Sequence, residues 1–454
     1  MATDDSEVAK LQRRVAELEA EVREKDAVIE QLKEKLGVSD STVVDLTVGN
    51  ERELLTRERA EALLKCCGEN ITEVHLGTKS FGADAAEVAA LELKKCKNLK
   101  IADLADIIAG RKEAEALEVL KAVCGALPTT IKVLDLSENA LGEKGVRALE
   151  STLGSFTELE EVSFYNNGLS ELSLKLLAEY LPTGSLKRIH FHNNMSGNGG
   201  AVALANMLKN AAMLTDVRMS SSRVRPDGGC ELIKSIGTHT HFLTKLNLGD
   251  SMFGESGAQA LTETLPKLLN LEELVLRDTG LEEEGLEALL VCLGNPEVVP
   301  NLKLLDLSIL EVGCDENAQR VGAICSLRKH LNHLKLEENE LETSGALKLL
   351  VGLGNPMSCS LETIDLRTNQ IGRVGANAMV EYFLKTPAGK KIELNDNQIS
   401  SDGLNAIQNL IKDKPDLLGS LDENEPEMDE DDEDDAEDDL NYISSLLEAS
   451  LKLS

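Results

Sequence analysis

The sequence places few side chains at the spacings that catalysis or metal binding requires. His190 and His192 lie two residues apart, so on a strand both would project from one face, where two imidazoles can hold a metal ion. No nearby cluster of Cys or carboxylates would complete the coordination. We therefore interpret the pair as surface contact residues, with a metal site as the alternative. His239 and His241 are expected in an exposed loop near a helix end.

Two common catalytic motifs are missing. The chain contains neither a G-x-x-x-x-G-K-[ST] phosphate loop nor a G-x-S-x-G nucleophile elbow. We predict that the protein is not itself an enzyme and that it uses no metal and no cofactor.

One loop differs from the corresponding loops of the chain. A predicted strand segment at 99–108 is followed by Ala109, Gly110, Arg111 and Lys112, where similar segments elsewhere continue x-x-N-x-L. A Gly-Arg pair in a loop longer than its context needs is a candidate functional site. The alternative is a solvated Arg that covers the edge of a helix.

Further polar residues follow predicted strands in the N-terminal half and would form one rim with this loop. A mixture of Arg, Tyr and Asn is typical of protein interfaces. The predicted rim consists of Arg111, Lys112, Glu138, Tyr165, Asn166, His192, Asn193, Arg223 and Asp250.

These residues are placed by an internal repeat that fills about residues 40 to 415. Each unit reads L-x-x-L-x-L-x-x-N-x-L and is followed by Gly-Ala or Gly-Leu, which we expect to open an amphipathic helix, as at Gly145, Gly257, Gly285, Gly345, Gly375 and Gly403. Units begin at Ile131, Leu159, Leu186, Leu214, Leu243, Leu271, Leu302, Leu331 and Leu361, in steps of 27 to 31 residues. Weaker units near Val43, Ile71, Leu99 and Ile392 make about 12 repeats plausible.

This pattern predicts an α/β fold. The L-x-L core is typical of a short strand whose alternate residues point inward, and the Asn that follows can satisfy backbone groups where the chain leaves the strand. No unit can bury its helix alone, so the units must stack. Units of this length with a full helix indicate a leucine-rich-repeat horseshoe of the ribonuclease-inhibitor-like class, with parallel strands inside and helices outside. The Asn positions are Asn139, Asn167, Asn194, Asn339, Asn369 and Asn397.

Residues 1–39 carry a seven-residue apolar period. Val8, Val15, Val22, Ile29 and Leu36 hold one register, and Leu11, Leu18 and Leu32 hold the other, interrupted by Lys25. β-Branched residues at one position with Leu at the other favour a parallel two-stranded coiled coil. A single amphipathic helix docked on its own domain is the alternative. The sequence leaves open whether such a coil would form a homodimer or bind another partner.

Residues 416–454 form a predicted acidic tail. The run from 422 to 439 holds fourteen Asp or Glu and no Lys or Arg, so it cannot bury enough apolar surface to fold alone. Beyond it, a short amphipathic segment could form a helix on binding a partner, with a frayed terminus as the alternative; its apolar residues are Leu440, Ile443, Leu446, Leu447 and Leu451.

Composition narrows the classes of partner. The formal net charge is -33, which disfavours nucleic acid and anionic lipid and favours a basic protein. The nine Cys are odd in number and contain no CxxC pair, which indicates buried thiols in a reducing compartment. No signal-peptide core and no apolar run of about 18 residues occur, so we expect no membrane insertion.

Several strings resemble the Ran GTPase-activating proteins, particularly the plant-type repeat domain. They are 79–82 (KSFG), the loop of Gly110 and Arg111 with 113–119 (EAEALEV), 134–148 (LDLSENALGEKGVRA), 191–195 (FHNNM), 221–224 (SSRV), 252–254 (MFG) and 336–341 (LEENEL). The resemblance covers about residues 42 to 440, including the acidic tail. Plant-type members carry a Trp-Pro-Pro targeting domain, which this chain, with no Trp, lacks.

The resemblance implies that the protein accelerates GTP hydrolysis by the small GTPase Ran, which it meets in the GTP form. It also implies a cytoplasmic location, with the nuclear envelope or nuclear pore as the place of action. Arg111 matches the family's functional loop Arg, and Asn166 matches the Asn that precedes the repeat Asn, here Asn167. In this family the activator is understood to order the GTPase's own catalytic Gln. Asn166 suits that role, and Arg111 would orient the interface.

Two other functions remain open from the sequence. A non-catalytic repeat scaffold or inhibitor, dimerised by the coiled coil, would not need Arg111 and Asn166 in this register. A histone-binding chaperone would bind basic proteins through the acidic tail alone, whereas an activator would bind its partner on the rim.

Overall fold

A computed structural model of the protein describes residues 42–48, 52–313, 316–424 and 444–445. The predicted coiled coil at 1–39 and most of the acidic tail lie outside the described residues. The chain divides into two compact units, 1–131 and 132–454, each of which contains α-helices and parallel strands.

In the first unit, a parallel ladder runs in the order β1–β3–β5. A separate parallel pair, β2–β4, was not predicted from the sequence. Its strand β4 contains the first three KSFG residues, and Gly82 is the N-cap residue of α3. The elements are β1 (Val43–Asp45), β2 (Glu53–Leu55), α2 (Arg57–Leu64), β3 (Glu73–His75), β4 (Lys79–Phe81), α3 (Ala83–Leu93), β5 (Ile101–Asp103) and α4 (Glu113–Cys124).

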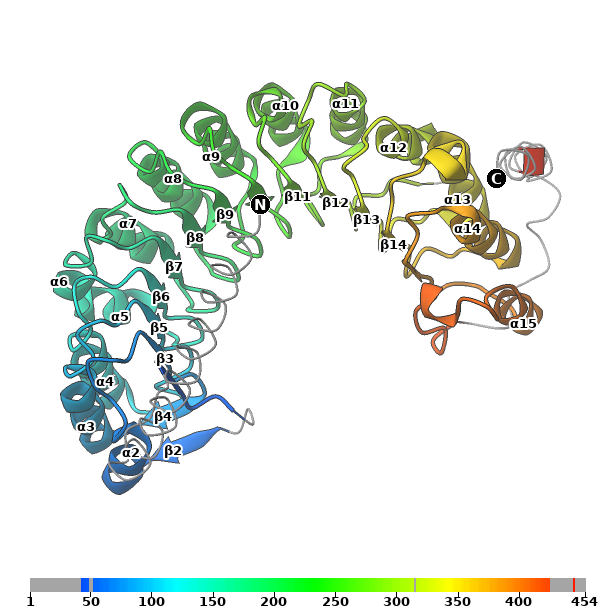
Figure 1. The fold of residues 1–454 in the computed structure, drawn as a ribbon. Helices are drawn as coiled ribbons and strands as arrows, with labels where there is room; N and C mark the ends of the chain where they lie inside the picture. Colours follow the sequence, from blue (N-terminus) through cyan, green and yellow to red (C-terminus); the bar gives the residue numbers. More distant parts are fainter. Residues whose placement is uncertain (1–41, 49–51, 314–315, 425–443, 446–454) are drawn as a thin grey trace, which may run out of the picture. The chain divides into compact units, whose positions relative to one another are not determined.

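The second unit is a curved array with its strands on the inner side and its helices on the outer side (Figure 1). Consecutive strands pair in parallel from β6 to β15. The strands are β6 (Val133–Asp135), β7 (Glu161–Ser163), β8 (Arg188–His190), β9 (Asp216–Arg218), β10 (Lys245–Asn247), β11 (Glu273–Val275), β12 (Leu304–Asp306), β13 (His333–Lys335), β14 (Thr363–Asp365) and β15 (Lys391–Glu393).

Helices and short 3-10 turns connect these strands across the outer side. They are α5 (Gly142–Ala148), α6 (Glu150–Leu153), α7 (Glu171–Tyr180), α8 (Gly197–Leu208), α9 (Pro226–His239), α10 (Gly254–Thr264), η1 (Leu265–Lys267), α11 (Glu283–Leu293), α12 (Glu316–Ser326), α13 (Glu342–Leu353), η2 (Pro356–Ser358), α14 (Arg373–Lys385), α15 (Ser401–Leu410) and η3 (Pro415–Leu417).

The predicted repeat register and the α/β leucine-rich-repeat class are confirmed. Leu159 lies two residues before β7 and Leu361 two residues before β14, and both are fully buried. The strands are shorter than the predicted segment at 99–108, because β5 covers only Ile101–Asp103 and the chain turns soon afterwards, with Asp106 at a φ of 57°.

The asparagines satisfy backbone groups where the chain leaves each strand, as predicted, and they also join successive repeats into a side-chain ladder. Asn167 Oδ1 accepts from the backbone N–H of Asn139 at 3.0 Å, and Asn167 Nδ2 donates to the Leu136 carbonyl at 2.9 Å. The ladder ends at Asn424, which accepts from Asn397 N–H at 2.9 Å. The folded array therefore continues beyond the predicted boundary at residue 415.

Two other predictions need correction. The glycines expected to open helices lie inside them; Gly257, for example, is three residues into α10. The absence of a side chain at Gly257 leaves room for Phe253, because a Cβ on Gly257 would lie 2.3 Å from the Phe253 Cβ. The Cys residues are not uniformly buried, since Cys66 is exposed and Cys230 and Cys292 are half-buried. Every Cys in the described part of the chain is a free thiol.

Candidate functional site

The Arg111 loop belongs to the first unit and rests on strand β4. The Arg111 guanidinium donates through Nε to the Ser80 hydroxyl at 2.9 Å and through Nη2 to the Ser80 carbonyl at 2.7 Å. The Ser80 hydroxyl in turn donates to the Ala109 carbonyl at 2.6 Å. This bracing holds both ends of the short loop, in which Gly110 has a φ of 73°.

The Arg111 side chain is only 17% exposed, and its Nη1 lies 3.7 Å from Glu115 Oε1. It is therefore not the solvated Arg of the alternative interpretation. A guanidinium with three partners within the protein is fixed in place. This arrangement suits a side chain that positions its own loop better than one that extends into a partner's active site. Lys112 follows as the exposed N-cap residue of α4.

In the second unit, a column of turn residues repeats the same backbone conformation where each strand ends. Glu138, Asn166, Asn193 and Asp250 have φ values of 61°, 51°, 55° and 51°. Each donates its N–H to a carbonyl of the next repeat, as Asn166 does to His192 at 3.3 Å. Asn and Asp tolerate this left-handed conformation best among non-Gly residues. Position alone therefore does not distinguish Asn166 from its neighbours in the column.

Asn166 and Asn167 have opposite environments. Asn166 is exposed and donates from Nδ2 to Glu138 Oε2 at 2.6 Å. Asn167 is fully buried in the ladder. The Glu138 contact orients the Asn166 amide while leaving it on the surface, where a partner can reach it.

Two aromatic rings lie beside this position. The ring centroids of Tyr165 and His192 are 4.6 Å apart. Burial, together with the nearby charges of His190 and Arg218, lowers the pKa of His192 to about 4. The imidazole is therefore neutral near pH 7, and its ring, tilted by 41° to that of Tyr165, presents a largely apolar surface together with it.

The pair of His190 and His192, interpreted from the sequence as surface contact residues with a metal site as the alternative, lies beside an ion pair of Asp216 and Arg218. His190 Nε2 lies 3.2 Å from Asp216 Oδ2, and Arg218 donates to the same carboxylate at 2.7 Å. Burial would raise the pKa of Asp216, but the nearby His190 and the hydrogen bonds from Arg218 outweigh it and hold this pKa at about 2. Within the described residues, no group of three His, Cys, Asp or Glu side chains is arranged to hold a metal ion.

The remaining predicted residues of the second unit lie on the same edge of the array. Arg223 is exposed with a φ of 59°, and Asp250 is exposed in the turn after β10. The structure thus brings together Glu138, Tyr165, Asn166, His192, Asn193, Arg223 and Asp250 along the turns that follow β6 to β10. Arg111 and Lys112 belong to the other unit.

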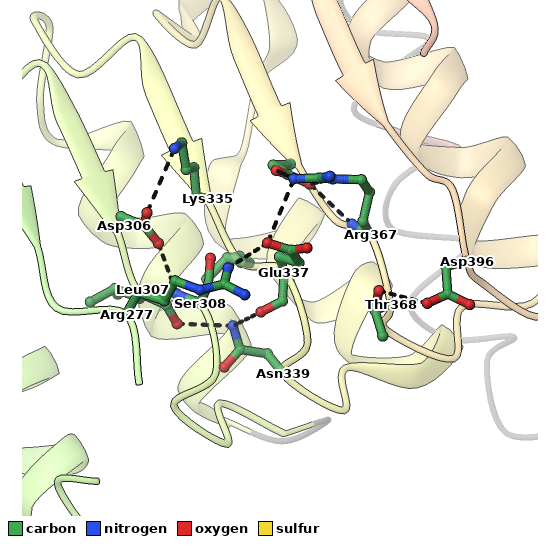
Figure 2. A network of polar contacts seen from close by, with 12 residues as sticks. Arg277, Asp306, Leu307, Ser308, Lys335, Glu337, Asn339, Arg367, Thr368 and Asp396 are labelled. Atoms are coloured by element: carbon green, nitrogen blue, oxygen red, sulfur yellow. Dashed lines mark hydrogen bonds and ion pairs between the residues drawn. The ribbon is translucent and has the colours of Figure 1, made fainter. Parts of the chain in front are cut away.

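A polar network that the sequence analysis missed occupies the inner side of the C-terminal repeats (Figure 2). Glu337 is bound by Arg277, which reaches it across the intervening repeat, and by Arg367 at 3.6 Å. Arg367 also pairs with Asp365 at 2.6 Å, and Lys335 lies 3.7 Å from Asp306. Side chains that pair with one another in this way are less available to bind a partner protein. In the sequence, this network could have been predicted from the alternation of opposite charges at strand positions that face inward.

A family model and two relatives agree with this architecture. The family model described as Leucine Rich repeat matches residues 128–149 and 358–380. RAN GTPase-activating protein 2 of Arabidopsis thaliana is 37% identical over 394 residues, which cover 86% of this chain and 71% of that protein. The ribonuclease inhibitor of Sus scrofa is 26% identical over 78% of this chain and 81% of its own length. A chain in the yeast Rad7 and Elc1 complex aligns with a TM-score of 0.48 and 15% identity, covering 95% of this chain and 96% of that chain.

The stacked repeats and their asparagine ladder define a leucine-rich-repeat protein of the ribonuclease-inhibitor-like class. Within it, identity to the Arabidopsis relative over most of both chains is decisive. The chain belongs to the family of Ran GTPase-activating proteins. Its described residues contain no helix long and apolar enough to cross a membrane.

Proposed function

We propose that this protein stimulates GTP hydrolysis by the small GTPase Ran and thereby maintains the difference between Ran-GTP and Ran-GDP used in nucleocytoplasmic transport. The observation that carries this proposal is the 37% identity, over 86% of the chain, to a relative named RAN GTPase-activating protein 2. The chain would act as a regulator, with the reacting groups supplied by Ran.

Asn166 is our candidate for the residue that completes the partner's active site. Its amide is exposed, is held by Glu138 at 2.6 Å, and can both donate and accept. A side chain fixed in this way loses little conformational freedom on binding, which favours the alignment of a partner's Gln with an attacking water. The neighbouring Tyr165, His192, Asn193, Arg223 and Asp250 would contact the GTP-bound form of Ran.

Arg111 is our candidate for a positioning residue. Arginine fingers that act in trans contribute roughly 10³–10⁵ to the rate by contacting the transferred phosphate. The Arg111 guanidinium already binds Ser80 and lies 3.7 Å from Glu115. We propose that it fixes its loop, with Lys112 beside it, and that it offers the remaining exposed edge to an acidic group of the partner.

The test is single-turnover GTP hydrolysis by Ran with catalytic amounts of this protein. Asn166→Gly is the sharpest variant, because Gly accepts the φ of 51° without strain while the amide is lost. We expect it to reduce the stimulation by about 10²–10³, the usual loss for a removed transition-state contact. Thr368→Gly is the matched control, since Thr368 has the same conformation, with a φ of 57°, in a distant repeat.

Arg111→Ala and Arg111→Lys complete the set, with thermal unfolding as a check on folding. Loss of stimulation in both, in folded protein, would support the positioning role. Stimulation that survives all three substitutions would keep the function and discard these sites. If the native chain gives no acceleration, a non-catalytic scaffold or inhibitor would take the proposal's place, as the similarity to a ribonuclease inhibitor allows.

We further propose a cytoplasmic location, at the nuclear envelope or nuclear pore, where Ran-GTP leaves the nucleus. The heptad residues at 1–39 would supply a homodimer contact or bind a separate coiled-coil partner. The location is proposed from the family. The role of residues 1–39 is proposed from the sequence, since this segment lies outside the described residues.

A further inference from the structure

Three successive repeats expose a large apolar residue in the turn that leads from the outer helix to the next strand. Met213 precedes β9, Phe242 precedes β10 and Leu269 precedes β11; they are 49%, 54% and 54% exposed. We call these three residues the turn strip. Met213 and Phe242 lie three residues ahead of their strands and Leu269 lies four ahead. The repeat does not need apolar side chains here, because the turns before β7 and β8 carry Glu158 and Ser185 three residues ahead of the strand.

The segments that hold the turn strip carry two lysines and two histidines and are free of acids, although Asp216, Glu263 and Glu272 follow or precede them directly. The segments 209–215, 238–244 and 264–271 contain Lys209, His239, His241 and Lys267 but no Asp or Glu. Farther along the same edge, Lys329 and His330 are exposed in the turn before β13. In a chain of net charge -33 such a stretch is unusual. Cations are favoured near helix C-termini, which accounts for the Lys residues but not for the exposed apolar ones.

We propose that this chain's own C-terminal segment docks on the turn strip. The segment has the complementary pattern: an acidic run up to Asp439, then Leu440, Ile443, Leu446, Leu447 and Leu451. Spacings of three, four and seven residues place apolar side chains on one face of a helix. The two described residues in this part, Ser444 and Ser445, have helical backbone.

The lengths match. The described array ends at Asn424, and the 15 residues from 425 to 439 can span about 50 Å when extended, as a self-repelling acidic run tends to be. Packed helices lie about 8–10 Å apart, so the five steps from the end of the array to the turn before β11 amount to roughly 40–50 Å. Because Asn424 lies at the edge where strands end and the turn strip at the edge where they begin, the run must also cross the array and has to be almost fully extended. A 12-residue helix is about 18 Å long, close to the two repeat steps between Met213 and Leu269.

The acidic run would therefore pass over Lys329 and His330, and the leucines would cover Met213, Phe242 and Leu269. Burial of exposed apolar surface drives the contact, and the opposite charges set its direction. This inference concerns the edge where strands begin and does not depend on the proposed activity, whose residues lie where strands end.

Hydrogen–deuterium exchange on the full-length protein tests the docking. Residues 440–454 should exchange slowly, and the combined variant Met213→Ser, Phe242→Ser, Leu269→Ser should accelerate their exchange by about tenfold or more, equivalent to a docking free energy of at least about 1.4 kcal/mol. The matched control replaces exposed apolar residues on the outer helices, Leu172→Ser, Val202→Ser and Val291→Ser, which are 42%, 37% and 62% exposed. The control should leave the exchange unchanged.

Fast exchange of 440–454 in the native chain would overturn the proposal, as would slow exchange that both triple variants preserve. If the slow exchange of residues 440–454 is lost when the protein is diluted, the segment docks on the turn strip of a second copy. This result would overturn docking within one chain. Accelerated exchange at about 1 M salt, where charges are screened beyond about 3 Å, would support the part assigned to the acidic run. If salt leaves the exchange rate unchanged, the acidic run does not contribute to docking, and that part of the proposal is wrong.

Discussion

Two adjacent asparagines in one turn have different roles, because the Asn167 amide is buried among backbone groups and the Asn166 amide is exposed. Asn167 accepts from the N–H groups of Asn139 and Leu141 and donates to the Leu136 carbonyl. Asn166 touches only Glu138 through its side chain and is exposed. The sequence motif L-x-x-N-x-L identified the buried one, and only the family resemblance singled out the other.

We predict that Asn167→Ala destabilises the protein by about 2–4 kcal/mol, because it leaves buried backbone groups without partners. Urea unfolding followed by circular dichroism measures the change. Asn166→Gly should shift the unfolding free energy by less than about 1 kcal/mol. Equal losses in the two variants would mean that the exposed amide is structural after all.

His192 gives the stability a pH dependence whose sign follows from its environment. Its pKa is about 4 in the folded chain, because of burial and then of the charges of His190 and Arg218, against an ordinary value of 6.5. Between these two values the unfolded chain binds a proton that the folded chain does not, so stability falls as the pH drops through this window.

At pH 5 this term removes up to about 2 kcal/mol relative to pH 7. His192→Gln should lose less stability than the native chain between these pH values in urea titrations. A loss of the same size in both proteins would show that His192 does not carry the effect. An NMR titration of the His192 ring should place its midpoint near pH 4.

At the scale of elements, close helix packing depends on glycines whose role the sequence did not reveal. A Cβ on Gly322 of α12 would lie 2.2 Å from the Leu349 carbonyl oxygen, and one on Gly352 of α13 would lie 2.1 Å from the Gln319 carbonyl oxygen. Both obstacles are backbone atoms, so the two helices would have to move apart.

We predict that Gly352→Ala destabilises the protein by about 3 kcal/mol or more, since overpacking typically costs about 1–3 kcal/mol when side chains can adjust. Thermal unfolding measures this loss. Gly184→Ala is the control, because a Cβ there meets nothing within 4 Å. If both variants unfold at the native temperature, the helices are not as tightly packed as the structure indicates.

The repeat period predicted the order of elements, the parallel sheet and the role of the asparagines at the strand exits, because every repeat shows the same local pattern. It did not predict β2 and β4, whose pairing joins residues of different repeats outside the L-x-L pattern. Nor did it predict the bracing of Arg111 by Ser80, a contact across 31 residues. Such contacts depend on where loops meet in space, which no local period encodes.

Across the second unit, the two edges of the array differ in charge. The turns that follow strands carry acids in the left-handed position, at Glu138, Asp250, Asp278, Glu338 and Asp396. The turns that precede strands carry Lys209, Lys267 and Lys329, with Glu158 and Glu297 in two others. Because every helix runs the same way, its N-terminus lies at the first edge and its C-terminus at the second, and charges of these signs stabilise those ends. A basic partner would be drawn to the edge that holds Asn166.

The side-chain ladder is not uniform along the second unit. Amides join neighbouring repeats from Asn139 to Asn194 and again from Asn339 to Asn424. Between them, Ser251 and Thr279 bond only carbonyls of their own turns through their side chains, at 3.5 Å and 2.7 Å. Backbone bonds such as Ser251 N–H to Asp278 O at 2.9 Å remain there.

Among the described residues, the amide ladder is therefore interrupted only at the strand ends of the repeats around β10 and β11. At the opposite edge of the same repeats, Asn270 Nδ2 donates to the His241 carbonyl at 2.9 Å and Asn301 Nδ2 donates to the Leu269 carbonyl at 2.8 Å. If a bound partner changes the curvature of the array, we expect these repeats to separate first on the side where their strands end, because no side-chain amide of the described chain joins them there.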